Sequence, residues 1–188
     1  MSIKNFLGLT VVGMSCLACQ SNVYQINGFA RDLTEGDTIC LRYEADEDRP
    51  TIITQVVDGK FSFTGETDAM TLCHIFPKQR PENAVSFFLE PSQITVELAL
   101  VPERNRVSGT TINNTWQQLN DSIRLLGNEV VRTAQLPVAD HETQQQRVKK
   151  VDRLHRQMSE CILNTARRNS HNPLGQYILQ NYKAPAFK

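Results

Sequence analysis

The sequence predicts an α+β fold in which an antiparallel β-sandwich of about eight short strands precedes an α-helical hairpin. Two observations carry this prediction. From residue 22 to about residue 111, apolar residues recur at every second position in short runs, which is the period of a half-buried strand. From residue 113 onward they recur every three or four positions, which is the period of one face of a helix.

The segments with strand character are short and are separated by turn residues or prolines. Asp58-Gly59 separates two of them, and this pair favours a type I′ hairpin turn because both central residues of that turn have positive φ. Prolines mark the later connections, since proline cannot donate to a central ladder. The expected strands span residues 23–31, 38–44, 51–57, 60–64, 71–76, 85–89, 93–101 and 106–108. Their number and spacing indicate a sandwich or an open barrel.

Two long helices and a short one are expected after the strands. Residues 113–115 offer N-caps for the first helix, and Pro137 is expected to end it. Asp140 is expected to cap the second helix, which ends before Pro173. Residues 174–182 are expected to form the short third helix. Because each long helix has one apolar stripe, the two most simply pack as an antiparallel hairpin.

The first residues resemble a bacterial lipoprotein signal peptide. Lys4 precedes an apolar run at residues 6–14, which is shorter than the roughly 20 residues of a membrane-spanning helix. Small residues then lead to Cys19, which is expected to be acylated and to become the new N-terminus. Cleavage before Cys16 and ordinary secretion are the alternatives. The predicted division of the chain is a signal peptide at 1–18, a sandwich domain at 19–112, and a helical hairpin with a C-terminal segment at 113–188.

Cys16 and Cys19 also form a C-x-x-C pair, which is the spacing of a thioredoxin-type redox site. Such a site needs a folded scaffold that lowers the thiol pKa, and residues 15–22 have neither a strand pattern nor a helix pattern. The pair is therefore interpreted as the end of the leader. Strand alternation places Cys40 opposite the apolar residues of its strand and Cys73 on the same face as Ile75. These two cysteines and Cys161 are expected to be separate structural thiols.

No catalytic, cofactor-binding or metal-binding residues are predicted. The chain has no nucleophile elbow, no glycine-rich phosphate loop, and no zinc-ligand spacing among its histidines and cysteines. A Ser-His-Asp arrangement stays open from the sequence alone. The formal net charge is +0, which argues against nucleic acid as a partner. The basic residues at 147–156 are interpreted as a solvated helix face, with anionic lipid or a protein partner as the alternative.

Residues 24–114 resemble a bacterial domain of unknown function, DUF4369. The resemblance rests on an ordered set of short segments at residues 24–28, 39–43, 57–65, 87–91, 94–96, 107–110 and 113–114. It implies that this domain precedes a thioredoxin-like disulfide oxidoreductase domain, as it commonly does in lipidated envelope proteins. Residues 172–177 resemble the linker helix that leads into that domain. The redox domain itself is expected to be absent, since the sequence ends at Lys188.

The expected function is that of a lipid-anchored cell-envelope protein that faces the periplasm and acts as a non-catalytic binding or scaffold module. Cys19 is the predicted lipidation site. The expected partners are the membrane, through the N-terminal lipid, and another envelope protein. No cofactor is expected. The alternatives are an accessory subunit of a thioredoxin-like oxidoreductase and a truncated form of such an enzyme.

Overall fold

The structure is a computed structural model that describes residues 22–44, 50–137 and 140–182. Within these ranges the strands are β1 (Val23–Ala30), β2 (Thr38–Tyr43), β3 (Ile52–Gln55), β4 (Lys60–Glu66), β5 (Thr71–Pro77), β6 (Val85–Leu89), β7 (Gln93–Leu98) and β8 (Arg106–Ser108). The helices are α1 (Thr111–Ala134), α2 (His141–Arg168) and α3 (Pro173–Asn181), with short 3-10 turns η1 (Pro81–Asn83) and η2 (Pro102–Arg104). The predicted α+β fold, with the sandwich first and the helices after it, is confirmed.

The eight strands form two four-stranded sheets, in the orders β4-β1-β7-β8 and β3-β2-β5-β6. Every neighbouring pair is antiparallel except β1 and β7, which run parallel, with Ile26 opposite Ile94. The prediction of a wholly antiparallel sandwich is therefore wrong at this pair. Alternation along a strand shows which face is buried, but it carries no information on the direction of a partner that is distant in the sequence.

The core lies between the inner faces of the two sheets. Ile26, Ile39, Leu41, Ile75 and Ile94 are fully buried there, as the alternation of their strands predicts. Further core residues are Phe61, Phe63, Phe87, Leu89, Val96 and Leu98. Both sheets thus bury one apolar face against the other, which is the arrangement that stabilises a sandwich.

The predicted turn conformation at Asp58-Gly59 is confirmed, but the strands on either side of it pair only through an isolated bridge between Val57 and Lys60. Asp58 has φ 50° and Gly59 has φ 67°, so both central residues adopt the left-handed conformation of a type I′ turn. Val57 and Lys60 close the turn with two backbone hydrogen bonds of 2.8 and 3.0 Å. The turn joins β3, at the edge of one sheet, to β4, at the edge of the other.

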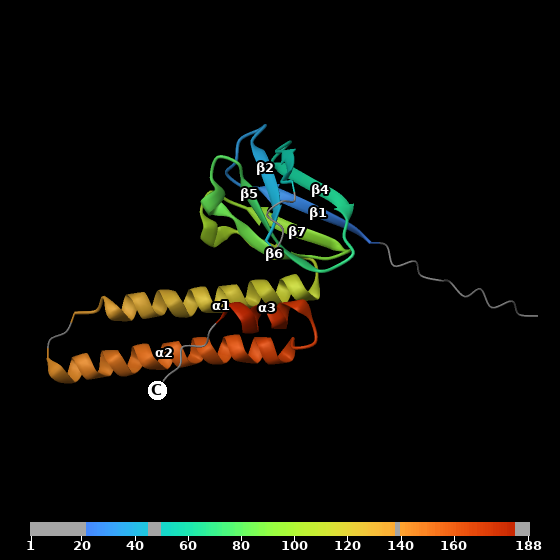
Figure 1. The fold of residues 1–188 in the computed structure, drawn as a ribbon. Coiled ribbons are helices and arrows are strands. Elements are labelled where there is room, and N and C mark those ends of the chain that lie inside the picture. The colour runs from blue at the N-terminus through green and yellow to red at the C-terminus, as the bar shows by residue number, and fades with distance from the viewer. Residues whose placement is uncertain (1–21, 45–49, 138–139, 183–188) are drawn as a thin grey trace, which may run out of the picture.

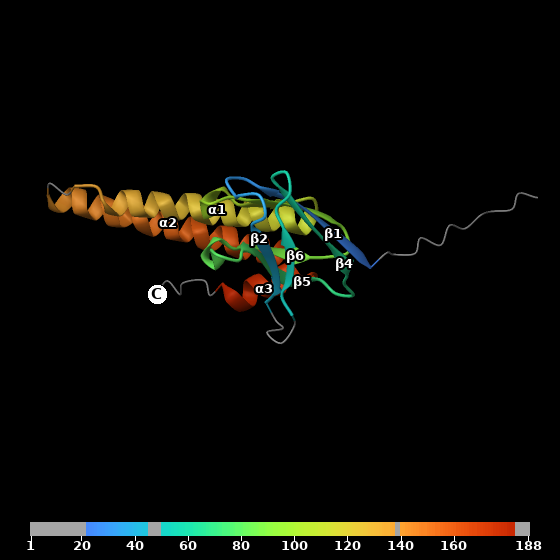
Figure 2. The same cartoon turned by 90° about the horizontal axis from the view of Figure 1, so that it is seen from above.

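The helices lie against one side of the sandwich. Figure 1 shows α1 running past the sandwich with α2 antiparallel beside it, and the end of α1 and the start of α2 project well beyond the strands. Figure 2 shows the same projection from above, with α3 beside the sandwich end of the hairpin. Trp116, Leu119 and Ile162 of the long helices join the sandwich residues in one buried cluster, as do Leu174 and Ile178 of α3.

The predicted cap of α2 is confirmed, because the Asp140 side chain accepts a hydrogen bond from the Thr143 N–H at 2.7 Å. Asn172 caps α3. The first helix, however, begins two residues before the predicted cap segment. Thr110 caps α1 by accepting from the Asn113 N–H at 3.1 Å, which places Asn113 inside the first turn. None of the helices in the described ranges is long and apolar enough to cross a bilayer.

Candidate functional site

The start of α1 joins the helices to the open edge of both sheets. Asn113, which is fully buried, accepts from the Phe88 N–H at 2.8 Å and donates to the Phe88 carbonyl at 2.8 Å. One helical turn later, the Gln117 side chain accepts from the Val107 N–H at 2.9 Å. Phe88 lies on β6 and Val107 on β8, the edge strands of the two sheets. Two side-chain amides therefore pair with backbone that a sheet edge would otherwise leave unsatisfied.

An aromatic cluster holds α3 against the same edge. The rings of Phe88, Trp116 and Tyr177 meet edge to face, with centroids 5.7 to 5.9 Å apart, and Tyr182 lies 6.3 Å from Trp116. The Trp116 indole N–H donates to the Ser86 carbonyl at 2.9 Å. Edge-to-face pairs add to the stabilisation from burial. The cluster joins β6, α1 and α3 into one rigid junction.

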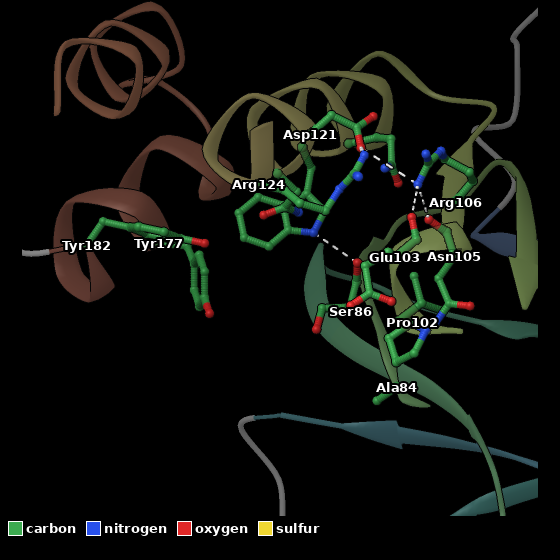
Figure 3. Close-up of a pocket in the computed structure, with 14 residues that line it drawn as sticks. Ala84, Ser86, Pro102, Glu103, Asn105, Arg106, Asp121, Arg124, Tyr177 and Tyr182 are labelled. Carbon is green, nitrogen blue, oxygen red and sulfur yellow. Dashed lines mark hydrogen bonds and ion pairs between the residues drawn. The ribbon is translucent and has the colours of Figure 1, made fainter. Parts of the chain in front are cut away.

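A cleft of about 340 Å³ opens at this junction. We call it the junction cleft, and it is lined by β6, the η2–β8 segment, α1 and α3. Figure 3 shows Ser86 on its floor, Arg106, Asp121 and Arg124 on one side, and Tyr177 with Tyr182 on the other. Segments that are distant in the sequence therefore meet at one site, and most of the side chains that line it are polar.

The charged wall of the junction cleft is centred on Asp121. Its carboxylate lies 2.8 Å from Arg124 and 3.6 Å from Arg106. Arg106 is itself fixed, since it donates to the backbone carbonyl of Glu103 at 2.9 Å. Partial burial acts to raise the pKa of Asp121, but hydrogen bonds from Arg124 and Gln117, together with the two guanidinium charges, lower it overall. The carboxylate is therefore held in its charged, accepting form.

A second polar chain runs from the floor of the junction cleft across the outer face of the β3-β2-β5-β6 sheet. Ser86 Oγ lies 3.0 Å from His74 Nδ1, and His74 Nε2 contacts the Glu44 carboxylate. Ser86 and His74 are direct neighbours on β6 and β5, and Glu44 follows β2 on the far side of β5. Three strands thus place a hydroxyl, an imidazole and a carboxylate in one line.

This polar chain ties Ser86 of β6 to His74 of β5 and, through His74, to Glu44 after β2. An ionised carboxylate can only accept a hydrogen bond, whereas an imidazole and a hydroxyl can each donate or accept one. Ser86 lies within β6 rather than on the sharp turn that exposes a nucleophile in α/β-hydrolases.

The two tyrosines at the junction cleft stay neutral. Burial raises the pKa of Tyr177, and the nearby Glu44 charge raises it further. Burial also raises the pKa of Tyr182, with a smaller contribution from Tyr177. Each ring thus combines an apolar face with a protonated hydroxyl at its tip.

The structure places the predicted thiols apart from the junction cleft. Cys40 lies on the outer face of β2, and Cys73 is buried on the inner face of β5 opposite Tyr43. Cys40 and Cys161 are free thiols. Burial raises the pKa of Cys40, although Lys78 acts to lower it. A buried thiol with a raised pKa is a poor nucleophile, so Cys40 is poorly suited to thiol exchange.

Cys19, the predicted lipidation site, and Cys16 lie outside the described residues. The predicted signal peptide and the predicted domain boundaries are likewise not tested by the structure. They stay predictions from the sequence.

The basic stretch on α2 has two uses in the structure. Arg147 donates to the Ala134 and Leu136 carbonyls at 3.1 Å each, which satisfies the end of α1. Lys150 pairs with Glu129 of α1 at 2.7 Å. The other basic residues of the stretch are exposed: Lys149, Arg153 and Arg156.

Three of the four histidines lie on α2 or after it: His141, His155 and His171. In the part of the chain that the structure describes, no group of three histidine, cysteine, aspartate or glutamate side chains is arranged to hold a metal ion.

Sequence analysis did not find the residues of the junction cleft. Ser86 and Asp121 look like ordinary polar positions on the outer face of a strand and of a helix. A signal was nevertheless present, because Asn113 lies three residues before the buried Trp116 on α1 and four residues before Gln117. Amides beside a buried stripe need partners, and the exposed backbone of a sheet edge is one source of them.

The fold and the junction cleft define an α+β protein whose sandwich carries a helical appendage. A family model described as Domain of unknown function (DUF4369) matches residues 24–116. The chain belongs to this family through its sandwich domain, and the matched region extends into α1 as far as Trp116. No curated protein matches the chain.

Proposed function

We propose that the protein is a lipid-anchored, non-catalytic binding module of the cell envelope, and that it recognises its ligand or partner in the junction cleft. The observation that carries the proposal is the junction cleft itself, where the sandwich and two helices supply one set of polar walls. Its volume falls within the range of small-molecule sites.

The junction cleft is preorganised, which favours binding. Asn113 and Gln117 fix α1 to the two sheet edges, and the aromatic cluster fixes α3. A site whose walls are already held in place loses less conformational entropy when it binds than one that must first become ordered.

The polar groups in the walls are also oriented. Asp121 is bonded to Arg124, and Ser86 is bonded to His74. The junction cleft therefore offers fixed donors and acceptors rather than a nonpolar surface that would accept any apolar group.

The proposed location rests on the leader sequence. A positive residue, an apolar run of nine residues and small residues precede Cys19, as they do in secretory signals. Acylation of Cys19 would attach the protein to the membrane, with the sandwich facing the periplasm. A single acyl chain gives marginal attachment, and the several chains of a bacterial lipoprotein give stable attachment.

The test is metabolic labelling with an alkyne-bearing fatty acid in an envelope-producing host, followed by fractionation. The wild type and the Cys16→Ser variant should both be labelled and fractionate with membranes. The Cys19→Ser variant should lose the label. Label retained by Cys19→Ser, or lost with Cys16→Ser alone, would show that the lipid site is assigned wrongly.

The non-catalytic part has its own test. The purified protein is incubated with envelope extracts, and the products are compared by mass spectrometry with those of the His74→Phe variant. Identical product profiles are expected. Turnover of an envelope compound by the wild type that His74→Phe abolishes would overturn this part of the proposal.

A further inference from the structure

We infer that the ligand of the junction cleft is a short, uncharged saccharide. This inference rests on the proposed binding function and specifies its ligand class. It is argued from the charge balance of the junction cleft, the kinds of hydrogen-bonding groups in its walls, its aromatic side and its size.

The charges in the walls balance. Arg106 and Arg124 are positive, and Glu103 and Asp121 are negative. Both arginines already face the Asp121 carboxylate, at 3.6 and 2.8 Å. A phosphate or another strongly charged group would therefore gain little net attraction and would have to displace an ion pair. An uncharged ligand avoids both costs.

The hydrogen-bonding groups are mixed and closely spaced. The Asp121 carboxylate is an acceptor, the Arg124 guanidinium is a donor, and the Asn120 amide is both. A ligand that satisfies all of them must donate and accept at neighbouring positions. The hydroxyl groups of a sugar ring do this, since each is a donor and an acceptor and they stand on adjacent carbons.

The side of the junction cleft formed by α3 supplies apolar contact. Tyr177 and Tyr182 are half-buried, and their rings are held at the junction by edge-to-face contacts with Trp116. A sugar ring has C–H groups on one face and hydroxyls around its rim. It can pack its C–H face against an aromatic ring while its rim bonds to the polar wall, which matches the two-sided character of tyrosine sites.

The size of the junction cleft limits the length of the ligand. About 340 Å³ lies near the lower end of small-molecule sites. One or two sugar units therefore fit, either as a free sugar or as the end of a longer glycan. Both sources share the same chemistry, and a comparison of reducing-end and non-reducing-end derivatives distinguishes them.

Trp116 makes the test direct, because it is the single tryptophan of the sequence and it lines the junction cleft. The protein from residue 20 onward is titrated with glucose, N-acetylglucosamine, chitobiose, maltose and mannobiose while tryptophan emission is recorded. Glucose 6-phosphate and glucuronic acid are the charged counterparts of glucose. At least one uncharged sugar should shift the emission saturably, and the two charged sugars should bind more weakly than that sugar.

Two variants on the same helix provide a matched comparison. Arg124→Gln removes a donor from the junction cleft, and Arg132→Gln removes an arginine that is paired in the same i,i+3 manner with Glu129, two turns away. Arg124→Gln should weaken binding by about tenfold or more, because the lost hydrogen bond involves a charged group. Arg132→Gln should bind like the wild type. Circular dichroism verifies that both variants remain folded.

Three outcomes would overturn the inference. The first is no change in emission with any of the sugars at roughly 10 mM, a concentration above any dissociation constant expected of a preformed site. The second is tighter binding of the charged sugars than of the uncharged ones. The third is an equal loss of sugar affinity in the two variants. Short uncharged peptides are titrated in parallel. If a peptide binds and Arg124→Gln weakens it, the saccharide inference fails while the proposed binding function stands. If neither class binds, binding in the junction cleft fails as well.

Discussion

The two halves of the α1–α2 hairpin are stabilised in different ways. The half near the sandwich buries Asn113, Trp116 and Leu119 of α1, and it buries Ile162 and Ala166 of α2. In the half that projects away from the sandwich, Thr133 is the one buried residue among those that the structure describes in α1 beyond Leu119. Several apolar side chains of this half are exposed instead: Leu125, Val131, Leu136 and Val148.

This difference shows which part of the hairpin depends on the sandwich. The near half is held by tertiary packing and by bonds to sheet edges, and packing of this kind supplies most helix stability in proteins. The far half is held by the Asp140 cap and by two polar contacts between the helices, namely the Arg147 bonds to the end of α1 and the Lys150–Glu129 pair. Regions with few buried contacts open at lower free energy than the core does.

The largest expected effect comes from Asn113→Ala in the near half. The change removes both partners of the Phe88 backbone at a buried site. Leaving a buried N–H and C=O unsatisfied should lower the free energy of unfolding by roughly 2–4 kcal/mol, measured by urea denaturation. Asn114→Ala is the control, since Asn114 is exposed and makes one longer bond of 3.3 Å to Gly109. Equal losses in the two variants would show that the near half does not depend on the edge bonds.

A smaller and local effect is expected from Asp140→Ala in the far half. Loss of this N-cap should destabilise the start of α2 by about 1 kcal/mol. Amide hydrogen exchange should therefore become faster over the first turns of α2 and should not change at Trp116. Asp152→Ala on the exposed surface of the same helix is the control. Faster exchange throughout the protein would mean that the two halves unfold together.

The smallest effect is expected from the titration of Asp121, which lies where the near half ends. Its pKa is lowered in the folded protein, so its contribution to stability is fully present above the ordinary value of 3.8. The contribution is lost as the pH falls below that value through the folded pKa. Urea midpoints of the wild type should therefore fall more steeply than those of Asp121→Asn as the pH is lowered from 5 to 3. If the urea midpoints of the two proteins fell in parallel with pH, the Asp121 charge would make no contribution to stability.

Local sequence patterns predicted the elements of this fold well. The Asp58-Gly59 turn, the Asp140 cap and the strand alternation each depend on residues within a few positions of one another, and each was confirmed. The start of α1 was predicted wrongly, because Asn113 resembles a cap by residue type. Its side chain instead pairs with Phe88, which is 25 residues away in the sequence, and Thr110 takes the cap.

The junction cleft was out of reach of the same reasoning. It forms where β6, α1 and α3 meet, and the positions of these elements depend on the pairing of strands that are distant in sequence. The parallel register of β1 and β7 shows the same limit, since alternation gives the buried face of each strand and not its partner. The line from Ser86 through His74 to Glu44 likewise exists only after three strands are placed side by side.

The direction in which the hairpin projects determines how far the molecule would extend from a lipid attached at Cys19. β1 begins at Val23, four residues after Cys19, so a lipid on Cys19 would hold the start of β1 within about 14 Å of the bilayer surface. The 24 residues of α1 span about 36 Å, and the end of α1 and the start of α2 lie at the opposite end of the molecule from the start of β1 (Figure 1). A lipid anchor on Cys19 would then attach the protein at one end and leave the exposed Leu136 and Val148 side chains at the other, far from the point of attachment.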